Sequence, residues 1–227
     1  MEKTAAAEDV PAETIRQGLA QGVIVITQNL KHRKIAPLAI GKGLRTKVNA
    51  NVGTSKDHMN VEEELEKVRV AIEAGADTIM DLSTGPGIDE ARKTVMKAST
   101  VPVGTVPIYQ AAIEMPRKKN RPMVEMTADD LFEAIERHGE DGVDFLTVHC
   151  GGARLSVDKI KKEGRLMGVV SRGGAILVEW MDYNKRENPL FEEYDRLLAI
   201  AKAYDMTLSL GDGLRPGCLA DATDRAQ

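Results

Sequence analysis

The sequence predicts an α/β protein whose parallel strands alternate with helices, as in a (β/α)8 TIM-type barrel. Strand-like apolar stretches and helical patterns alternate along the chain, which indicates parallel strands joined by crossover helices. Nearly every expected strand ends in polar or glycine-rich residues. About six such βα units are present, fewer than the eight that close a barrel, so the predicted barrel is incomplete.

The expected elements follow one another in order. We expect strands over residues 46–53, 77–85, 101–110, 143–152, 167–177 and 206–217. We expect helices over residues 61–75, 88–98 and 128–139, and a further helix from residue 189. Asn60, Thr127 and Asn188 are suitable N-caps, and Gly75 and Gly139 suit helix ends. This order of elements fits both an open doubly wound sheet and a barrel.

The positions of the polar residues favour the barrel. The ends of the expected strands carry Asn51, Asp81, Ser83, Tyr109, His149, Ser171, Arg172, Asp212 and Arg215. In a barrel the carboxyl ends of all strands converge on one mouth, where active sites form. In an open sheet only the ends at the switch point would reach a ligand. Six strands that each end in polar groups therefore suit the barrel better.

The domain organisation follows from the same pattern. Residues 1–45 are expected to form an N-terminal helical or extended segment, and residues 46–227 the partial barrel. The final residues, 220–227, are typical of the start of another helix. We therefore expect the sequence to be incomplete at its C-terminus.

Composition excludes several functional classes. Of the 227 residues, 42% are hydrophobic and 29% charged, and the net charge of −4 favours neither nucleic acid nor an anionic membrane. The short basic run over residues 117–122 is expected to be a solvated loop. No apolar run is long enough to span a bilayer and no signal-peptide core is present, so we expect a cytoplasmic location. Cys150, Cys218 and four scattered histidines form no self-contained metal site.

Two glycine-rich motifs suggest a site for a phosphorylated ligand. "VVSRGG" places Ser171, Arg172 and Gly173 after an apolar stretch, where open backbone N–H groups, a hydroxyl and a guanidinium suit a phosphate. "GDGLRPG" offers Asp212 to ligand donors and Arg215 to an anion. A polar turn and a local ion pair remain the alternatives for these motifs. His149, as a residue at a strand end, is either a core histidine or an acid–base group.

The longer motifs resemble one family. "KVNANVGTS", "GADTIMDLSTG", "VPVGTVPIYQA", "GVDFLTVHCG", "GVVSRGGAILVEWM" and "SLGDGLRPGCLADATDRAQ" are similar to the phosphomethylpyrimidine synthase family, from about Ile15 to the last residue. The resemblance implies a radical S-adenosylmethionine (SAM) lyase built on a (β/α)8 barrel. Such an enzyme converts 5-aminoimidazole ribonucleotide to hydroxymethylpyrimidine phosphate in thiamin biosynthesis. It uses a [4Fe–4S] cluster, SAM, and zinc or iron.

The resemblance also implies which residues bind the substrate. Carried over motif by motif, they are Asn51, Met80, Tyr109, His149, Ser171, Arg172, Gly173, Asp212, Gly213, Leu214 and Arg215. We expect Ser171, Arg172 and Gly173 to hold the phosphate and Asp212 to face the ribose or imidazole. The family's metal-binding histidines and cluster cysteines would lie beyond residue 227. The chain is therefore expected to be the substrate-binding part, inactive alone, with a homodimer as a plausible assembly.

Three other functions stay open at this point. A hydroxybenzimidazole synthase uses the same ribonucleotide and similar motifs to make a cobamide lower ligand. A non-catalytic half-barrel could bind a ribonucleotide or pair with a second chain. A generic aldolase-like barrel fits least, because no lysine for a Schiff base lies at a strand end.

Overall fold

The computed structural model describes residues 1–226 as two compact units. The first unit comprises residues 1–105, 137–146 and 201–208. The second unit comprises residues 106–136, 147–200 and 209–226. Among the described residues, every helix is too short or too polar to cross a lipid bilayer.

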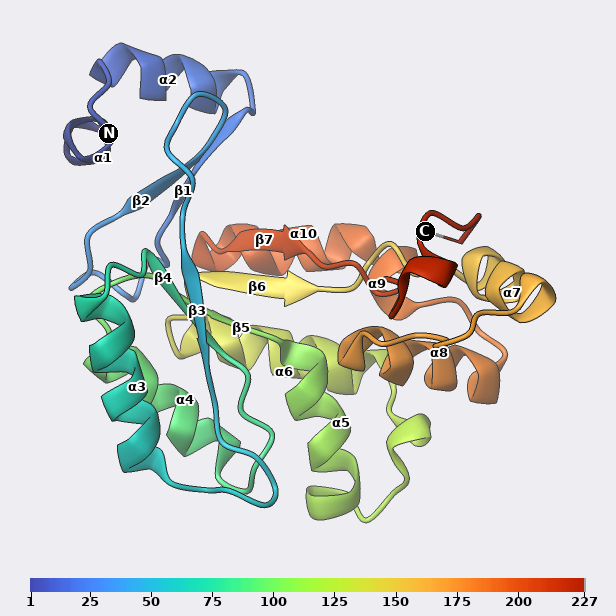
Figure 1. The fold of residues 1–227 in the computed structure, drawn as a ribbon. Coiled ribbons are helices and arrows are strands. Elements are labelled where there is room, and N and C mark those ends of the chain that lie inside the picture. The colour runs from blue at the N-terminus through green and yellow to red at the C-terminus, as the bar shows by residue number, and fades with distance from the viewer. Residues whose placement is uncertain (227) are drawn as a thin grey trace. The chain divides into compact units, whose positions relative to one another are not determined.

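The chain alternates between helices and strands (Figure 1). The helices are α1 (Glu2–Ala7), α2 (Ala12–Ala20), α3 (Val61–Glu73), α4 (Ile88–Ala98), α5 (Pro107–Lys118), α6 (Ala128–Glu140), α7 (Arg154–Glu163), α8 (Arg172–Asn184), α9 (Pro189–Glu192) and α10 (Tyr194–Tyr204). The strands are β1 (Ile24–Thr27), β2 (Leu38–Gly41), β3 (Asn49–Val52), β4 (Thr78–Asp81), β5 (Val103–Thr105), β6 (Phe145–Val148) and β7 (Thr207–Leu210). Short 3-10 turns, η1 (Met123–Glu125) and η2 (Leu219–Asp221), complete the order.

Five strands form one sheet in the sequential order β3-β4-β5-β6-β7. The pairs β3–β4, β4–β5 and β5–β6 are parallel, as the alternation of elements predicts. Strands β6 and β7 begin in the first unit and end in the second. The sheet formed by the described residues is open, with β3 and β7 at its edges. The predicted parallel α/β fold is therefore confirmed, while a closed barrel stays a proposal.

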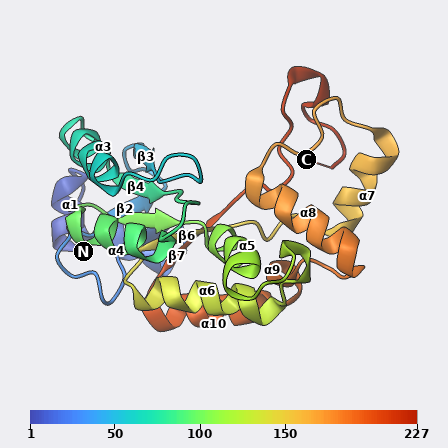
Figure 2. The ribbon, with the colours of Figure 1, turned by 90° about the horizontal axis from the view of Figure 1, so that it is seen from below.

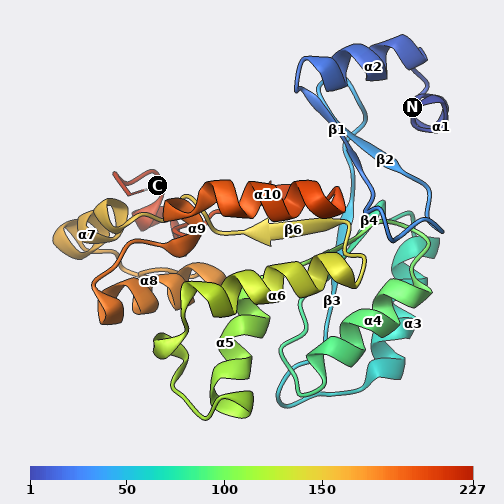
Figure 3. The same cartoon turned by 180° about the vertical axis from the view of Figure 1, so that it is seen from behind.

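The first unit also contains an antiparallel hairpin. Strands β1 and β2 pair with Ile24 opposite Gly41 and Thr27 opposite Leu38. A small apolar core, formed by Ala5, Ile15, Ile24 and Ala39, lies between this hairpin and helices α1 and α2. Helices α3 and α4 pack side by side next to β3 and β4 (Figure 3). All four residues of β4 are buried, as expected for a strand inside a parallel sheet.

The predicted N-caps are confirmed in both units, whereas Gly139, expected at a helix end, lies inside α6. The Asn60 side chain accepts a hydrogen bond from the Glu63 amide at the start of α3. Thr127 and Asp130 form a reciprocal capping box, in which each backbone N–H donates to the other side chain. Asn188 accepts from the Leu190 amide at the start of α9. Local polar residues therefore define where these helices begin.

One expected strand is wrong in type, and the others are shorter than expected, since those predicted over 143–152 and 206–217 end at Val148 and Leu210. Residues 167–177 do not form a strand, because Ser171 caps α8 and the apolar residues that follow are helical. The strand expected over 101–110 ends at Thr105, and Pro107 occupies the first turn of α5. The sheet of residues 1–226 consequently has five strands instead of six.

Candidate functional site

Helix α8 provides the centre of a group of polar residues in the second unit. Its N-cap, Ser171, is buried, and the Ser171 Oγ accepts from the Gly174 amide at 3.2 Å. The first residues of the helix therefore present open backbone N–H groups and the positive end of the helix dipole. Trp180, a buried residue of α8, anchors the helix to the segment around Met126, since its indole N–H donates to the Met126 carbonyl at 2.6 Å. A helix N-terminus held in this way suits an anion.

Glycines allow two other segments to approach the start of α8 closely. A Cβ on Gly173 would lie 2.3 Å from Cε1 of His149, so only glycine fits against this ring. A Cβ on Gly174 would lie 1.7 Å from the Gly213 carbonyl oxygen. The start of α8 therefore touches both the His149 segment and the loop after β7. The sequence motif indicated an open backbone here, but it did not reveal the two contacts that require the glycines.

His149 is buried at the end of β6 with an unsatisfied ring nitrogen. The residue is 4% exposed, and within residues 1–226 its Nδ1 atom has no hydrogen-bond partner. Burial lowers the pKa of His149, the charge of Arg215 lowers it further, and Asp212 opposes this shift. Buried polar atoms almost always have partners, so this nitrogen is a candidate to bind a ligand or an ordered water. The ring is thus neutral near pH 7 and available to a ligand.

Asn188 supports the turn that holds His149. Its side-chain amide donates to the His149 carbonyl at 2.8 Å and to the Gly152 carbonyl at 3.1 Å. Asn188 is fully buried and also caps α9. The sequence identified Asn188 as a cap only, because its two contacts with residues 149–152 join segments far apart in the chain.

Two arginines bring positive charge to this group. The Arg172 guanidinium lies 5.2 Å from the centre of the Tyr109 ring, in a cation–π contact. Burial raises the pKa of Tyr109, whereas the charges of Arg172 and Arg215 lower it. Both Arg172 and Arg215 are exposed. Asp212 Oδ1 accepts from the Leu214 amide at 3.0 Å, which folds the loop that carries Arg215.

The structure thus brings together most of the predicted site residues. Tyr109, His149, the Ser171–Arg172–Gly173 triplet and the Asp212–Arg215 segment all belong to the second unit. Tyr109 reaches the group from the first turn of α5 and not from a strand end. Figure 2 shows α5 and α8, two of the elements that carry these residues.

Asn51 and Met80 belong to the first unit. They are opposite each other in the β3–β4 register, with Asn51 exposed and Met80 8% exposed. The Asn51 side-chain oxygen accepts from Asn49 Nδ2 at 3.2 Å. Their participation in ligand binding stays a prediction.

The cysteines do not fit an iron–sulfur cluster. Cluster iron is bound by several cysteine thiolates, whereas the chain has two cysteines. Burial raises the pKa of the Cys150 thiol to about 11, so the thiolate is disfavoured there. The Cys218 thiol donates to Asp221 at 3.4 Å. No group of three or more histidine, cysteine or acidic residues in residues 1–226 could hold a metal ion.

The chain is thus an α/β protein with a parallel sheet, in which exposed arginines and close-packed glycines surround the start of helix α8. Residues 1–227 match the Radical SAM ThiC family, and the chain belongs to that family. It is 62% identical, over all 227 residues, to proteins named phosphomethylpyrimidine synthase from Geobacter metallireducens and Syntrophus aciditrophicus. The identity to the protein of the same name from Moorella thermoacetica is 57% over the whole chain. The chain spans about half the length of these curated relatives, 52%, 53% and 52% respectively.

Proposed function

We propose that the second unit binds 5-aminoimidazole ribonucleotide as the substrate-binding part of a phosphomethylpyrimidine synthase. Membership of the Radical SAM ThiC family supports this reaction class. The observation that carries the proposal is the buried, unpartnered Nδ1 of His149, which lies in a group with two arginines and a helix N-terminus. A ligand with both an anion and a nitrogen heterocycle would satisfy all three features.

The phosphate is assigned to the start of α8. Backbone N–H groups at residues 172 and 173 and the helix dipole favour an anion, and Arg172 adds a charge-assisted donor. Arg215 brings a second positive charge to the same group of residues, since its charge lowers the pKa of both Tyr109 and His149. The Tyr109 ring restricts the Arg172 guanidinium through their cation–π contact. Positive charge and open N–H groups thus act on the same end of the ligand.

The remaining groups are assigned to the ribose and imidazole. A neutral His149 ring can exchange one hydrogen bond with the heterocycle through Nδ1. The Asp212 carboxylate is exposed and accepts hydrogen bonds, so it suits hydroxyl or amino donors. In this arrangement the side chains bind and orient the ligand, and none of them has to transfer a proton.

The radical chemistry is assigned to parts of the protein outside these 227 residues. The family implies SAM and a [4Fe–4S] cluster, which supply a carbon radical when bound, and the residues described above do not fit the cluster. A zinc or iron site is assigned to the same outside parts.

We also propose that the five parallel strands form part of a (β/α)8 barrel in the complete protein, supported by their sequential order. The expected homodimer and cytoplasmic location stay predictions.

Substitution of Arg172 tests the ligand assignment. In the complete protein that carries this chain, Arg172→Ala should weaken binding of 5-aminoimidazole ribonucleotide by about 10- to 100-fold, as expected for loss of a charge-assisted hydrogen bond. Isothermal titration calorimetry measures this change. Arg186→Ala is the matched control, because Arg186 is exposed and lies over the Trp180 ring, 6.0 Å from its centre. Wild-type affinity in the Arg172 variant would remove this residue from the site.

A second measurement separates binding from radical chemistry. The purified 227-residue chain, supplied with iron, sulfide, a reductant and SAM, should release no 5′-deoxyadenosine, because its cysteines do not fit a cluster. Chromatography of the reaction mixture detects this product directly. Its appearance would show that these residues do assemble the radical-forming centre.

A further inference from the structure

Two loops of the second unit carry most of the proposed ligand-binding groups. Residues 164–171, here called the α8 loop, lead into Ser171 and Arg172. Residues 211–226, here called the β7 loop, contain Asp212 and Arg215. Neither loop is a helix or strand over most of its length, so its own backbone hydrogen bonds do not fix its shape. Figure 2 shows the C-terminal segment close to α7 and α8.

One buried arginine joins the two loops. Arg165 lies in the α8 loop, and its side chain is 1% exposed. Its Nε and one terminal nitrogen donate to the two carboxylate oxygens of Asp224, at 2.6 and 2.8 Å. Its other terminal nitrogen donates to the Gly168 carbonyl at 3.3 Å and to the Leu214 carbonyl. The guanidinium therefore bonds its own loop and two points of the β7 loop.

A second acid strengthens the same connection. Asp221 of the β7 loop accepts from the backbone amides of Leu166 and Met167, both at 2.8 Å. Both carboxylate oxygens thus hold the residues that directly follow Arg165. Together, Arg165, Asp221 and Asp224 form what we call the loop clamp.

The clamp acts directly on the peptide that precedes Arg215. The Leu214 carbonyl belongs to the same planar peptide group as the Arg215 amide. Arg165 fixes that carbonyl, and Asp212 fixes the amide on the other side of Leu214. Both peptide groups around Leu214 are therefore held, and the direction in which the chain presents Arg215 is determined.

Direct ligand binding by Arg165 does not fit these contacts. Its guanidinium is buried and already makes four hydrogen bonds to the protein, whereas Arg172 and Arg215 are exposed. We propose that Arg165 is a positioning residue, which sets the β7 loop against the α8 loop so that Arg215 and Arg172 act on one anion. This inference rests on the function proposed above.

The test compares variants of the clamp in the complete protein. Arg165→Lys keeps the charge but loses the planar fork that binds Asp224 with two parallel hydrogen bonds. It should weaken binding of 5-aminoimidazole ribonucleotide by about tenfold, with KM raised more than kcat is lowered. Asp224→Asn should cause a smaller loss in the same direction. Affinities are measured by calorimetry at a temperature where circular dichroism shows every variant fully folded.

Two control variants separate positioning from general stability. Arg225→Gln changes an exposed arginine next to Asp224, 3.7 Å from Glu163, and should leave affinity unchanged. Arg92→Lys perturbs a buried ion pair in the first unit and should lower the melting temperature without changing affinity.

Wild-type affinity and KM in a folded Arg165→Lys protein would overturn the positioning role. If Arg172→Ala also binds normally, the proposed function itself fails; if only Arg172→Ala weakens binding, the positioning inference alone fails.

Discussion

Two buried histidines show how differently the two units use the same side chain. His138 in the first unit is 2% exposed, and both of its ring nitrogens have partners. Arg92 donates to Nε2 at 3.1 Å, so Nδ1 carries the proton and donates to Thr105 Oγ1 at 2.7 Å. His149 in the second unit is almost as buried, but its Nδ1 has no partner among the described residues. Burial alone therefore does not distinguish the two histidines, whereas hydrogen-bond satisfaction does, in line with the ligand-binding role proposed for His149.

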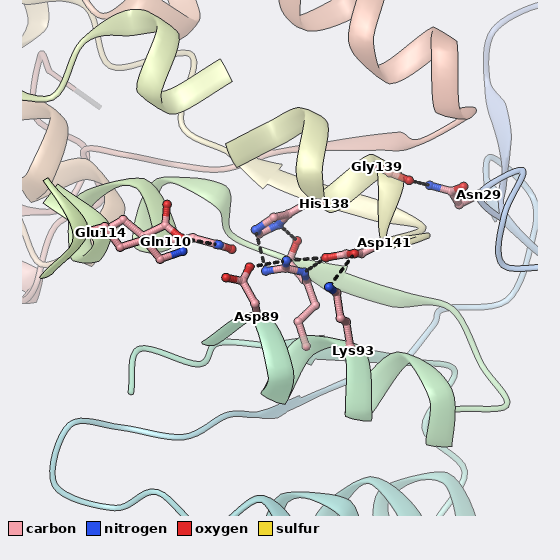
Figure 4. Close-up of polar contacts among 11 residues, drawn as sticks. Asn29, Asp89, Lys93, Gln110, Glu114, His138, Gly139 and Asp141 are labelled. Atoms are coloured by element: carbon pink, nitrogen blue, oxygen red, sulfur yellow. Dashed lines mark hydrogen bonds and ion pairs between the residues drawn. The ribbon is translucent and has the colours of Figure 1, made fainter. Parts of the chain in front are cut away.

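The environment of His138 explains its satisfied state. Figure 4 shows His138, Asp89 and Asp141 grouped in the first unit. The Arg92 guanidinium, which is buried there, donates to Asp141 at 3.0 Å through Nε and to Asp89 at 2.8 Å. The group forms a closed network of charge-assisted hydrogen bonds, and its function is to stabilise the fold.

The largest expected effect is loss of this network. Arg92→Met should lower the free energy of unfolding by about 3–5 kcal/mol, because it removes the positive partner of a largely buried ion pair. Chemical denaturation followed by circular dichroism measures this loss. Arg69→Met on α3, whose ion pairs with Glu66 and Glu73 are exposed, is the control and should leave stability nearly unchanged. Equal losses in the two variants would show that the Arg92 network does not stabilise the first unit.

The same substitution at both histidines tests the comparison directly. His138→Leu should cost about 2–3 kcal/mol of stability, because Arg92 and Thr105 each lose a buried hydrogen-bond partner. His149→Leu should change stability by less than about 1 kcal/mol, because its Nδ1 makes no bond to lose, but should weaken ribonucleotide binding about tenfold. Denaturation and calorimetry on both variants measure the two effects. The comparison breaks if His149→Leu destabilises the protein as much as His138→Leu does.

The protonation of His138 predicts a pH dependence. Burial lowers its pKa well below the usual value, the charges of Arg92 and Arg137 add to this, and Asp89 opposes it. A histidine with a depressed folded-state pKa contributes stability at pH values above the unfolded pKa of about 6.5, and this contribution is lost as the pH falls below it. The wild-type protein should therefore lose up to about 1.4 kcal/mol more per pH unit than His138→Leu between pH 6.5 and 5.

Denaturation midpoints at several pH values measure this difference. His149 has a lowered pKa and Asp81 a raised one, but both groups are present in the two proteins, so their contributions cancel in the comparison. Parallel curves for the wild type and His138→Leu would show that the pKa of His138 is the same in the folded and the unfolded protein.

Local sequence signals predicted much of the fold and part of the site. The caps at Asn60, Thr127 and Asn188 each bond an amide only two or three residues away, so local sequence predicted them correctly. The expected strand over 167–177 was wrong because a continuous apolar run does not distinguish a strand from a buried helix. Ser171, a good N-cap, was the available signal for α8.

The contacts that complete the site could not be predicted from local patterns. Arg165 and Asp224 are 59 residues apart, and the Asn188 side chain reaches back 39 residues to the His149 carbonyl. Such pairs form only when the fold brings their segments together. Tyr109 was expected at a strand end, although Pro107 two residues earlier is a typical signal for the first turn of a helix.

The smallest effect is expected for a hydrogen bond that is exposed to water. Asn60 caps α3 in the first unit with one hydrogen bond of 3.3 Å to the Glu63 amide, and the bond is exposed to water. Asn60→Ala should therefore lower stability by only about 1 kcal/mol, since water can replace the lost partner of the amide. Ribonucleotide affinity should not change. Asn60→Ser, which retains a cap oxygen, should recover most of the stability. A loss as large as that in His138→Leu would mean that the cost of removing a hydrogen bond does not depend on its burial. The difference in stability expected between His138→Leu and His149→Leu would then lose its physical basis.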